Sequence, residues 1–466
     1  MTESGLLYLP VRELAARIRS RRLSPVALTE LSLSRLETLG PKLNAVVTVM
    51  RESALREAHA AEAEIARGRV RGPLHGIPYG VKDLLATKGV PTTWGAEPYR
   101  DQVFDHDATV VTRLREAGAI LCAKLAMVEL AGGMGYNHPD ASFTGPGLTP
   151  WNTGFWSGGS SSGPGAAVAA GLVAFAIGSE TSGSILTPSA YSGVTGLRPT
   201  YGLVSRHGAM ALSWTLDKLG PMGRTADDCA QVLAAIAGPD DADPTSSGRT
   251  FTWTPKAPRR LRVAVIKGTV EKVQPAVRDH FEAALVALGD TVTITRDVAF
   301  PDLPWGPAVG AIVTAEGASA FLDLIESGGV AKLKCPADRT GGYSGLLLPA
   351  VDYLQAMRLR KPMREAMRKM FESYDVIASP TRGTVAYPIG DFANAYPGIS
   401  SGPSLIAAGN LTGLPALAMP TGFGENGLPT SMTFMGAPFS EATLCSLGAA
   451  YQARSDWHRR HPEAFA

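Results

Sequence analysis

The stretch FWSGGSSSGPGAAVAAG, residues 155–171, places three consecutive serines, Ser160, Ser161 and Ser162, between glycines. It passes directly into LVAFAIGSE, residues 172–180. The small apolar residues that end the first segment predict a closely packed helix, and the run after it is typical of a buried strand. Because apolar sequence follows at once, the loop does not have the composition of a flexible spacer. A loop, a helix and a buried strand in succession indicate an α/β fold.

Short apolar runs alternate with Gly-rich turns and helical segments on both sides of this stretch. The clearest further strands are LRVAVIKG at 261–268, YDVIASPT at 374–381 and LPALAMPTG at 414–422. An amphipathic helix is predicted directly after the first of them. Runs that are apolar throughout, rather than alternating, indicate strands covered on both faces. We therefore predict one large α/β domain with a central mixed, mostly parallel, twisted sheet that helices cover on both faces.

The N-terminal part of the chain is predicted to be helical. One helix is expected over 24–40, where Ser24 caps the free N–H groups and Pro25 takes the first helical position, and another over 53–67. The Asp-, Pro- and Ser-rich residues 239–258 are expected to form a surface excursion. The single predicted domain, 1–466, comprises a helical region at 1–70, a catalytic core at 71–225, a more variable substrate-side region at 240–400, and a return to the core at 400–466.

The composition excludes several classes of protein. With 18% charged residues and a formal net charge of +2, the chain has no concentrated basic surface for a nucleic acid. The most apolar run, 166–177, is too short to span a membrane, and no secretory signal is visible. The cysteines include no C-x-x-C pair, which argues against a zinc site and a disulfide framework. We therefore expect a cytoplasmic protein with reduced thiols at Cys122, Cys229, Cys335 and Cys445.

Two common roles of Gly/Ser loops fit the triple serine poorly. A phosphate cradle typically follows a strand and ends in Gly-Lys-Ser/Thr, and GGSSSGPG has neither feature. The same residues match Gly-x-Ser-x-Gly with Ser161 as an elbow nucleophile, but that motif also requires a preceding strand. A nucleotide-binding module that uses this loop therefore stands only as an alternative hypothesis.

A serine nucleophile needs a base, and no histidine lies in the Gly/Ser-rich segments that could form a site. Lys82, in GIPYGVKDLLAT, lies in apolar sequence just after a predicted strand. Burial lowers the pKa of a lysine, so Lys82 is a candidate base. In GSETSGSILTPSAYSG, residues 178–193, Ser184 follows a tight turn and precedes a short predicted helix. Backbone N–H groups at such a turn point the same way, as a developing oxyanion requires.

Three separated segments together resemble the amidase signature family. They are GVKDLLATKGVPTTWG, SGGSSSGPGAAVAAG and SETSGSILTPSAYSGVTGLRPTYGLVS. The resemblance extends to GNLTGLPALAMPTGF and GLPTSMTFMGAPFSEATL near the C-terminus, and so covers nearly the whole chain. The separation of 24 residues between Ser160 and Ser184 also agrees with the spacing in that family.

The resemblance implies the amidase signature fold and a Ser-cisSer-Lys triad that uses no metal and no cofactor. Ser184 would attack the carbonyl, Ser160 would relay the proton, and Lys82 would be the final base. A cis peptide bond is implied before Ser160. The implied oxyanion hole consists of the backbone N–H groups of Thr181, Ser182, Gly183 and Ser184.

Three residues depart from the pattern Asp-x-Gly-Gly-Ser-Ile-Arg of many members: Glu180, Ser182 and Leu186. Because backbone donors do not depend on these side chains, we expect hydrolysis to survive, whereas loss of the Arg changes the substrate preference. Large side chains near the loop are candidates for an acyl or leaving-group pocket, with ordinary core packing as the alternative. They are Met134, Tyr136, Phe155 and Trp156.

The predicted function is a serine amidase that cleaves linear, non-peptide amide C–N bonds through an acyl-enzyme on Ser184. The same carbonyl chemistry extends to aryl amides, esters and carbamates, including urethanes. The expected partner is a small-molecule amide or carbamate, with neither a nucleic acid nor a membrane, and a homodimer is compatible with the sequence. The alternative within the family is the glutaminase subunit of a tRNA-dependent amidotransferase, which would need partner subunits.

Overall fold

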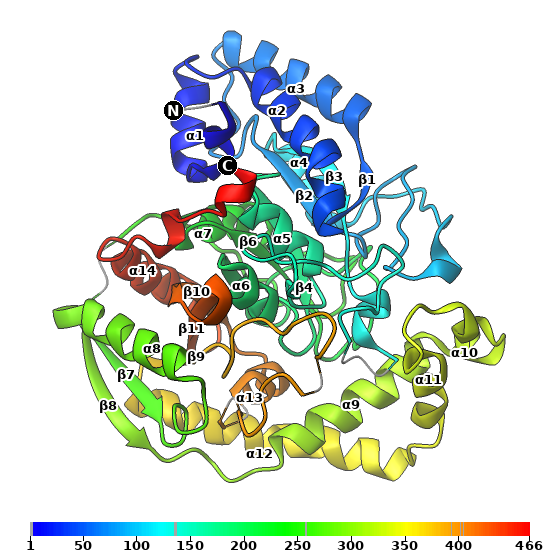
Figure 1. Ribbon diagram of the computed structural model, residues 1–466, viewed down its shortest axis with the longest axis vertical. Coiled ribbons are helices and arrows are strands. Elements are labelled where there is room, and N and C mark those ends of the chain that lie inside the picture. Colours follow the sequence, from blue (N-terminus) through cyan, green and yellow to red (C-terminus); the bar gives the residue numbers. More distant parts are fainter. Residues whose placement is uncertain (1–2, 135–137, 257–258, 393, 401, 404) are drawn as a thin grey trace.

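Eleven strands in the described part of the chain form one open, mixed sheet (Figure 1). The computed structural model describes residues 3–466 except 135–137, 257–258, 393, 401 and 404. The strands are β1 (Val46–Val49), β2 (Pro78–Lys82), β3 (Ile120–Leu125), β4 (Phe175–Glu180), β5 (Thr195–Arg198), β6 (Lys218–Gly223), β7 (Leu261–Ile266), β8 (Val292–Val298), β9 (Val376–Pro380), β10 (Ala416–Phe423) and β11 (Pro429–Gly436).

The order across the sheet is β1-β3-β2-β4-β6-β5-β10-β11-β9-β7-β8. Among the described strands, four neighbouring pairs are parallel and six are antiparallel. The sheet is therefore mixed, as predicted, but the expectation that it is mostly parallel is wrong. Antiparallel strands covered on both faces carry the same continuous apolar runs as parallel ones, so the runs do not reveal direction.

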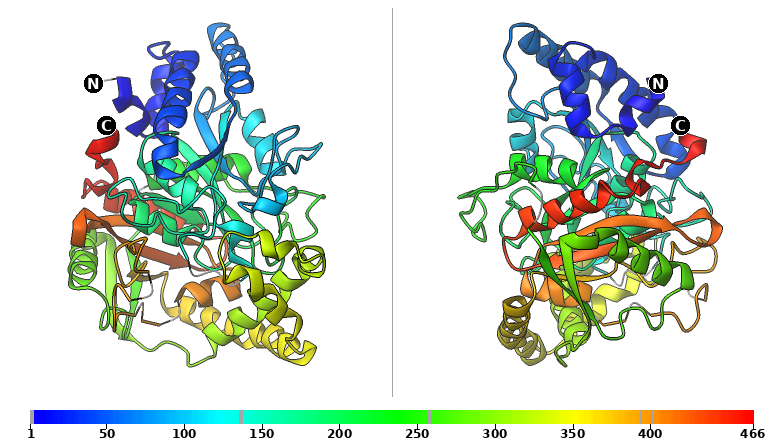
Figure 2. Two further views of the ribbon diagram at one scale, coloured as in Figure 1. Left: turned by 45° about the vertical axis from the view of Figure 1, so that its right-hand side comes forward. Right: turned by 90° about the vertical axis from the view of Figure 1, so that its left-hand side faces the viewer.

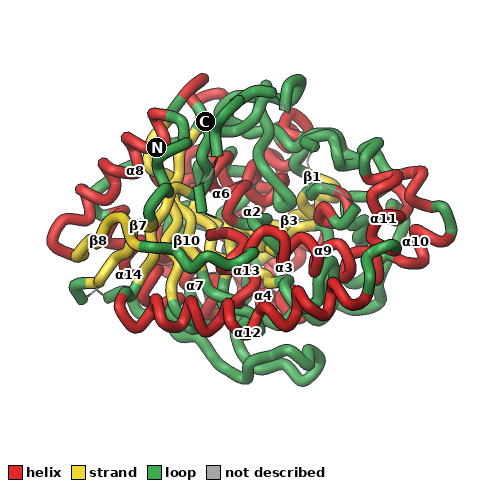
Figure 3. Tube along the Cα trace, turned by 90° about the horizontal axis from the view of Figure 1, so that it is seen from below, coloured by secondary structure: helices red, strands yellow, loops and turns green. Residues whose placement is uncertain are grey.

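Helices cover both faces of the sheet, as predicted (Figures 1 and 2). They are α1 (Val11–Arg19), α2 (Pro25–Thr38), α3 (Arg51–Ala66), α4 (Thr109–Glu116), α5 (Ser162–Ala169), α6 (Leu186–Ser192), α7 (Ala226–Ile236), α8 (Pro275–Leu288), α9 (Trp305–Ala320), α10 (Leu322–Glu326), α11 (Asp338–Leu346), α12 (Ala350–Ser373), α13 (Leu405–Thr412) and α14 (Glu441–Gln452). The long helix α12 runs along one side of the molecule, packed against α9 and α13 (Figure 3).

The alternation of side chains along β10 shows how the two faces are filled. Leu417 and Met419 belong to the apolar core on the face covered by α7, α8 and α14. Ala416 and Ala418 belong to the core on the other face, with residues of α12 and α13. Because successive strand side chains point to opposite faces, a run that is apolar at every position supplies both cores at once.

The N-terminal region agrees only in part with its prediction. Ser24 caps α2, where its hydroxyl accepts a hydrogen bond from the N–H of Ala27 at 3.2 Å, and α3 matches the second predicted helix. The region is not entirely helical, however, because residues 46–49 form the edge strand β1 against β3. Their sequence, VVTV, consists of β-branched residues, which favour a strand.

The remaining predicted elements are confirmed. The runs at 261–268, 374–381 and 414–422 contain β7, β9 and β10, and the predicted amphipathic helix is α8. Residues 239–256 of the predicted excursion contain no helix or strand where the structure describes them. The first described helical segment and the C-terminal residues lie close together (Figure 2), and the hydroxyl of Tyr8 lies 2.7 Å from the carbonyl oxygen of Phe465.

Candidate active site

The strands β2 and β4 are parallel neighbours, so their carboxyl ends meet at the same edge of the sheet. Lys82 is the last residue of β2, and Ser179 and Glu180 end β4. The side-chain nitrogen of Lys82 is fully buried and donates hydrogen bonds to the hydroxyls of Ser160 at 2.6 Å and Ser179 at 2.9 Å. The structure therefore brings together Lys82 and Ser160, which are 78 residues apart in the sequence.

The environment of Lys82 favours the neutral amine. Burial lowers the pKa of Lys82 from 10.5 to about 7, because the charged form loses its hydration. The carboxylates of Asp217 and Glu180 act in the opposite direction and limit the decrease. Lys82 can therefore exchange a proton near neutral pH, which an exposed lysine does not do.

The three consecutive serines have different contacts. Ser160 follows a cis peptide bond from Gly159, as the resemblance implied, and it alone of the three bonds Lys82. The hydroxyl of Ser161 donates to the carbonyl oxygen of Ser179 at 3.2 Å and accepts from its N–H at 3.3 Å. The Ser162 hydroxyl donates to the carbonyl oxygen of Ala126 at 3.4 Å. Ser161 and Ser162 therefore bond backbone atoms of other segments rather than the Lys82 side chain.

The loop is also buried, with Ser160, Ser161 and Ser162 between 0% and 2% exposed. It offers no open cradle in which a nucleotide phosphate could lie against backbone N–H groups. No strand precedes it within the described residues 138–161, in agreement with the reasoning against an elbow nucleophile. The carbonyl oxygen of Ser184 accepts a hydrogen bond from the N–H of Ser161 at 3.2 Å, which joins this loop to the turn after β4.

That turn, residues 181–185, connects β4 to α6 and holds Ser184 at 6% exposure. Gly183 has φ of 93°, a conformation that favours glycine over residues with a side chain. Among the described residues, no acceptor bonds the backbone N–H groups of Thr181, Ser182, Gly183 and Ser184. The turn thus presents consecutive unpaired donors beside a serine hydroxyl, the arrangement that a developing oxyanion requires.

Glu180 determines where the row of unpaired donors ends. Its Oε2 accepts the next two backbone N–H groups, from Ile185 at 2.9 Å and Leu186 at 3.0 Å. Its Oε1 accepts from the Arg198 guanidinium at 2.8 Å and the Asn410 amide at 2.9 Å. Burial tends to raise the pKa of Glu180, but Arg198 and the other donors outweigh it and lower the pKa to about 2. Glu180 is therefore a buried carboxylate that shapes the turn around Ser184.

A second carboxylate, that of Asp217, contacts Thr181 at the start of the turn. Asp217 accepts a hydrogen bond from the hydroxyl of Thr181 at 2.6 Å, and from the N–H groups of Leu212 and Ser213 at 2.9 Å each. The sequence predictions did not include Asp217, Arg198, Ser179 or Asn410. The available signal was charge within apolar strand sequence, since TLDKLG and GLRPT each place ionisable residues beside buried positions.

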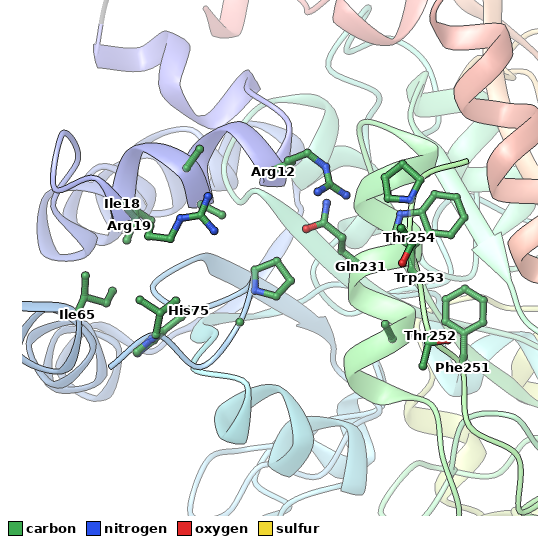
Figure 4. Close-up of a pocket in the computed structure, with 17 residues that line it drawn as sticks. Arg12, Ile18, Arg19, Ile65, His75, Gln231, Phe251, Thr252, Trp253 and Thr254 are labelled. Carbon is green, nitrogen blue, oxygen red and sulfur yellow. The ribbon is translucent and has the colours of Figure 1, made fainter. Parts of the chain in front are cut away.

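A cavity of about 270 Å³ lies against the turn. Ser182 and Leu186 form one side of it, and the other side comes from the end of β9, the residues Thr381 and Arg382 that follow it, and the start of α13 with Ile406. A Cβ atom placed on Gly183 would lie 3.4 Å from Cγ2 of Ile406, so this wall packs directly over the turn. A larger cavity, of about 760 Å³, lies elsewhere, between α1, α7 and residues 251–255 (Figure 4). It contains none of the predicted catalytic residues.

Met134, Phe155 and Trp156, the predicted pocket residues that the structure describes, do not line the 270 Å³ cavity. Met134 and Trp156 are 1% and 3% exposed and belong to two different apolar clusters, and Phe155 packs at the edge of the second. Tyr136 lies outside the described residues. The Trp156 ring stacks edge-on against Phe392, with ring centroids 5.7 Å apart. A pocket role for the four residues stays a prediction, and the burial of Met134 and Trp156 is the one expected of ordinary core packing.

The four cysteines are free and buried. The described residues contain no group of three or more His, Cys, Asp and Glu side chains arranged to hold a metal ion. None of the described helices combines the length and apolarity needed to cross a lipid bilayer.

Comparison with known proteins gives consistent results. The family model described as Amidase matches residues 27–445. The chain is 37% identical to the A-type subunit of glutamyl-tRNA(Gln) amidotransferase from Methylococcus capsulatus, over 97% of this chain and 98% of that protein. It is also 37% identical to the putative amidase AmiD of Mycobacterium tuberculosis, over 99% and 97%. The solved structure of peptide amidase from Stenotrophomonas maltophilia superposes with a TM-score of 0.85 at 30% identity, over 97% and 98%.

Proposed function

The chain belongs to the amidase signature family and is a hydrolase of amide C–N bonds, and on this premise we propose that Ser184, Ser160 and Lys82 form its catalytic triad. The observation that carries the proposal is the 2.6 Å hydrogen bond between the buried Lys82 nitrogen and the Ser160 hydroxyl, at the loop bonded to the turn of Ser184. An amine whose pKa is about 7 is neutral in a large fraction of molecules at neutral pH, so it can accept a proton.

In the proposed mechanism, the Ser184 oxygen attacks the carbonyl carbon of the amide and forms a tetrahedral intermediate. The Ser184 proton passes to Ser160, whose own proton passes to the neutral Lys82 amine. The intermediate collapses as the C–N bond breaks, and the proton returns through Ser160 to the leaving amine. A water molecule then attacks the acyl-enzyme by the same proton route, which releases the carboxylic acid and restores Ser184.

The negative charge that develops on the carbonyl oxygen needs donors that are already in place. In the proposed mechanism these donors are the unpaired N–H groups of Thr181, Ser182, Gly183 and Ser184. Glu180 and Asp217 hold the two sides of the turn, so little reorganisation is needed when the charge forms. Loss of one such donor typically reduces kcat about 100- to 1,000-fold, which indicates how much the turn contributes.

The test is hydrolysis of p-nitroanilides by the purified chain and by Ser184→Ala. We expect turnover in the unsubstituted enzyme and a loss of at least about 10³-fold in the variant, with an unchanged melting temperature. Ser160→Ala and Lys82→Met should be similarly inactive. Trapping of a covalent acyl-enzyme on Ser184 by mass spectrometry would identify the nucleophile directly. Full activity of Ser184→Ala would refute the proposal.

The substrate class is proposed to be small-molecule amides, with aryl amides, esters and carbamates sharing the same carbonyl chemistry. A screen that varies acyl chain length and leaving group, with p-nitroanilides beside p-nitrophenyl carbamates, ranks these classes. Light scattering on the same preparation determines whether the active species is a monomer or a homodimer.

A second candidate is the glutaminase subunit of a tRNA-dependent amidotransferase. The observation that favours it is the 37% identity over nearly the whole length of a glutamyl-tRNA(Gln) amidotransferase component. In that role the chain would hydrolyse glutamine only together with partner subunits. Efficient hydrolysis of simple anilides by the isolated chain, without partner subunits, would exclude a requirement for partners.

A further inference from the structure

A cavity of about 450 Å³ lies where the N-terminal residues 5–13 meet residues 458–461 near the C-terminus (Figure 2). Leu9 and Pro10 give it an apolar wall. The one carboxylate among its described lining residues, Glu13, is paired with Arg17 at 2.6 Å. The basic side chains that line it are Arg224, His458, Arg459 and His461. The cavity is therefore mainly basic, and it contains no residue of the proposed triad.

Arg224 is a buried guanidinium without a carboxylate partner. Its exposed fraction is 4%, and no carboxylate in the described part of the chain forms an ion pair with it. Its Nη2 donates to the carbonyl oxygens of Val168 and Ala169 at 3.1 Å each, and its guanidinium carbon lies 4.4 Å from the centre of the Tyr8 ring. Its Nε and Nη1 bond no acceptor among the described residues. Two of its three nitrogens are therefore free to donate.

A structural role accounts for only part of this arrangement. The two carbonyl groups end α5, and a cation is favourable at the C-terminal end of a helix. Burial without a counter-ion nevertheless lowers the pKa of Arg224 to about 10, although Tyr8 and Asp228 oppose the decrease. The oxygens of Asp228 already accept the N–H groups of Val11 and Thr225. An anion in the cavity would supply the counter-charge that Arg224 lacks.

His458 is a second buried group with unused hydrogen-bonding capacity. It is 8% exposed, and neither of its ring nitrogens bonds a partner among the described residues. Burial lowers the pKa of His458 to about 4, Arg459 and Arg224 act in the same direction, and Asp456 opposes them. The ring is therefore neutral at pH 7 and has one N–H to donate. Arg459 beside it is exposed and forms no ion pair with any described side chain.

Two guanidinium groups and an imidazole around one cavity suit a tetrahedral dianion, which has more oxygens and more charge than a carboxylate. We propose that this cavity binds a phosphate group through Arg224, His458 and Arg459. The site depends on side chains, because the nearby N–H groups of Thr225 and Ala226 already bond side chains of the protein. The volume is within the usual range for small-molecule sites, so the phosphate can be the free ion or the end of a small organic phosphate.

The test is calorimetry of the full chain at pH 7 and constant ionic strength. Inorganic phosphate should bind at least about tenfold more tightly than acetate, since it offers more oxygens to charged donors. Glycerol 3-phosphate distinguishes the two sources: tighter binding than inorganic phosphate would support an organic phosphate, and weaker binding would support the free ion. Absence of binding by both phosphates at millimolar concentration would overturn the proposal. Acetate binding as tight as that of phosphate would overturn it as well.

Arg459→Gln is the variant least able to disturb the fold, because this side chain is exposed and unpaired among the described residues. It should weaken phosphate binding about 10-fold, with an unchanged melting temperature. Arg51→Gln, at an exposed arginine paired with Glu37 and outside the cavity, is the matched control and should bind phosphate normally. Equal weakening in both variants would indicate attraction by overall charge and would refute a specific site.

The buried members of the site are tested by His458→Phe, which retains an aromatic ring but has no N–H, and by Arg224→Met. Each should weaken phosphate binding about 10- to 100-fold. If Arg224→Met fails to fold, because the end of α5 loses its partner, the other two variants still decide the matter. Unchanged affinity in both His458→Phe and Arg459→Gln would refute the proposal. Ser184→Ala should bind phosphate as the unsubstituted chain does, so this result is independent of the proposed triad.

Discussion

Lowering the pH from 8 to 6 should reduce kcat/KM about tenfold, because Lys82, with a pKa of about 7, takes up a proton over that range. The neutral fraction of such an amine is about 90% at pH 8 and about 10% at pH 6. Below pH 6 the rate should continue to fall tenfold per pH unit. Above pH 8 it should reach a plateau, since further deprotonation adds little neutral amine.

The magnitude follows from the surroundings of Lys82. A decrease of its pKa from 10.5 to about 7 corresponds to about 5 kcal/mol of preference for the neutral form. Burial causes the decrease, and Asp217 and Glu180 oppose it. Replacing Asp217 with Asn removes one of the opposing charges, so the pKa of Lys82 should fall further. The acid limb of the pH profile should then move to lower pH in Asp217→Asn.

The assay is kcat/KM for one p-nitroanilide from pH 5 to 9 at constant ionic strength, for the unsubstituted enzyme and for Asp217→Asn. Asp279→Asn, at an exposed carboxylate on α8, is the control and should leave the midpoint in place. An acid limb that does not shift in Asp217→Asn would show that Lys82 is not the titrating base, and a rate that does not fall between pH 8 and pH 6 would contradict a Lys82 pKa of about 7.

The same titration has a consequence for stability. Between about pH 7 and pH 10.5 the unfolded chain holds a proton on Lys82 that the folded chain does not, so stability rises with pH across this window. At pH 7 the buried lysine therefore destabilises the fold. Lys82→Met should raise the free energy of unfolding by about 1 to 4 kcal/mol at pH 7 while it abolishes activity. Denaturant unfolding at pH 7 measures this change, and a less stable variant would contradict the sign.

Two further substitutions test the supports of the site. Glu180→Gln should lower the free energy of unfolding by about 3 kcal/mol, because it leaves the buried Arg198 charge uncompensated, and adding Arg198→Met should restore part of this loss. Equal stability of the single and double variants in denaturant unfolding would contradict this coupling. Ser161→Ala should cost about 1 kcal/mol through the lost hydrogen bonds to the Ser179 backbone, yet retain far more activity than Ser160→Ala. The p-nitroanilide assay measures both serine variants. If Ser161→Ala were as inactive as Ser160→Ala, the prediction that Ser161 has no catalytic role would be contradicted.

Local sequence was sufficient for much of the fold. Ser24 and Pro25 identified the start of α2, and continuous apolar runs identified β4, β7, β9 and β10. These features depend on contacts within a few residues, which propensity and capping describe well. Strand direction was the main error, because it depends on which strands pair across the whole chain. The strand β1 was missed because only four residues form it, inside a region of helices.

For the candidate site, the sequence alone determined the segments: a lysine after a strand, a Gly/Ser loop, and a serine in a tight turn before a helix. Only the tertiary structure decided that Lys82 meets Ser160 at 2.6 Å, while Ser161 and Ser162 bond backbone instead. It also decided the roles of Glu180, Arg198 and Asp217, which act on the turn from three different strands or their ends. The physical reason is that buried charges are stabilised by partners distant in sequence, and the packing of the sheet brings those partners into contact.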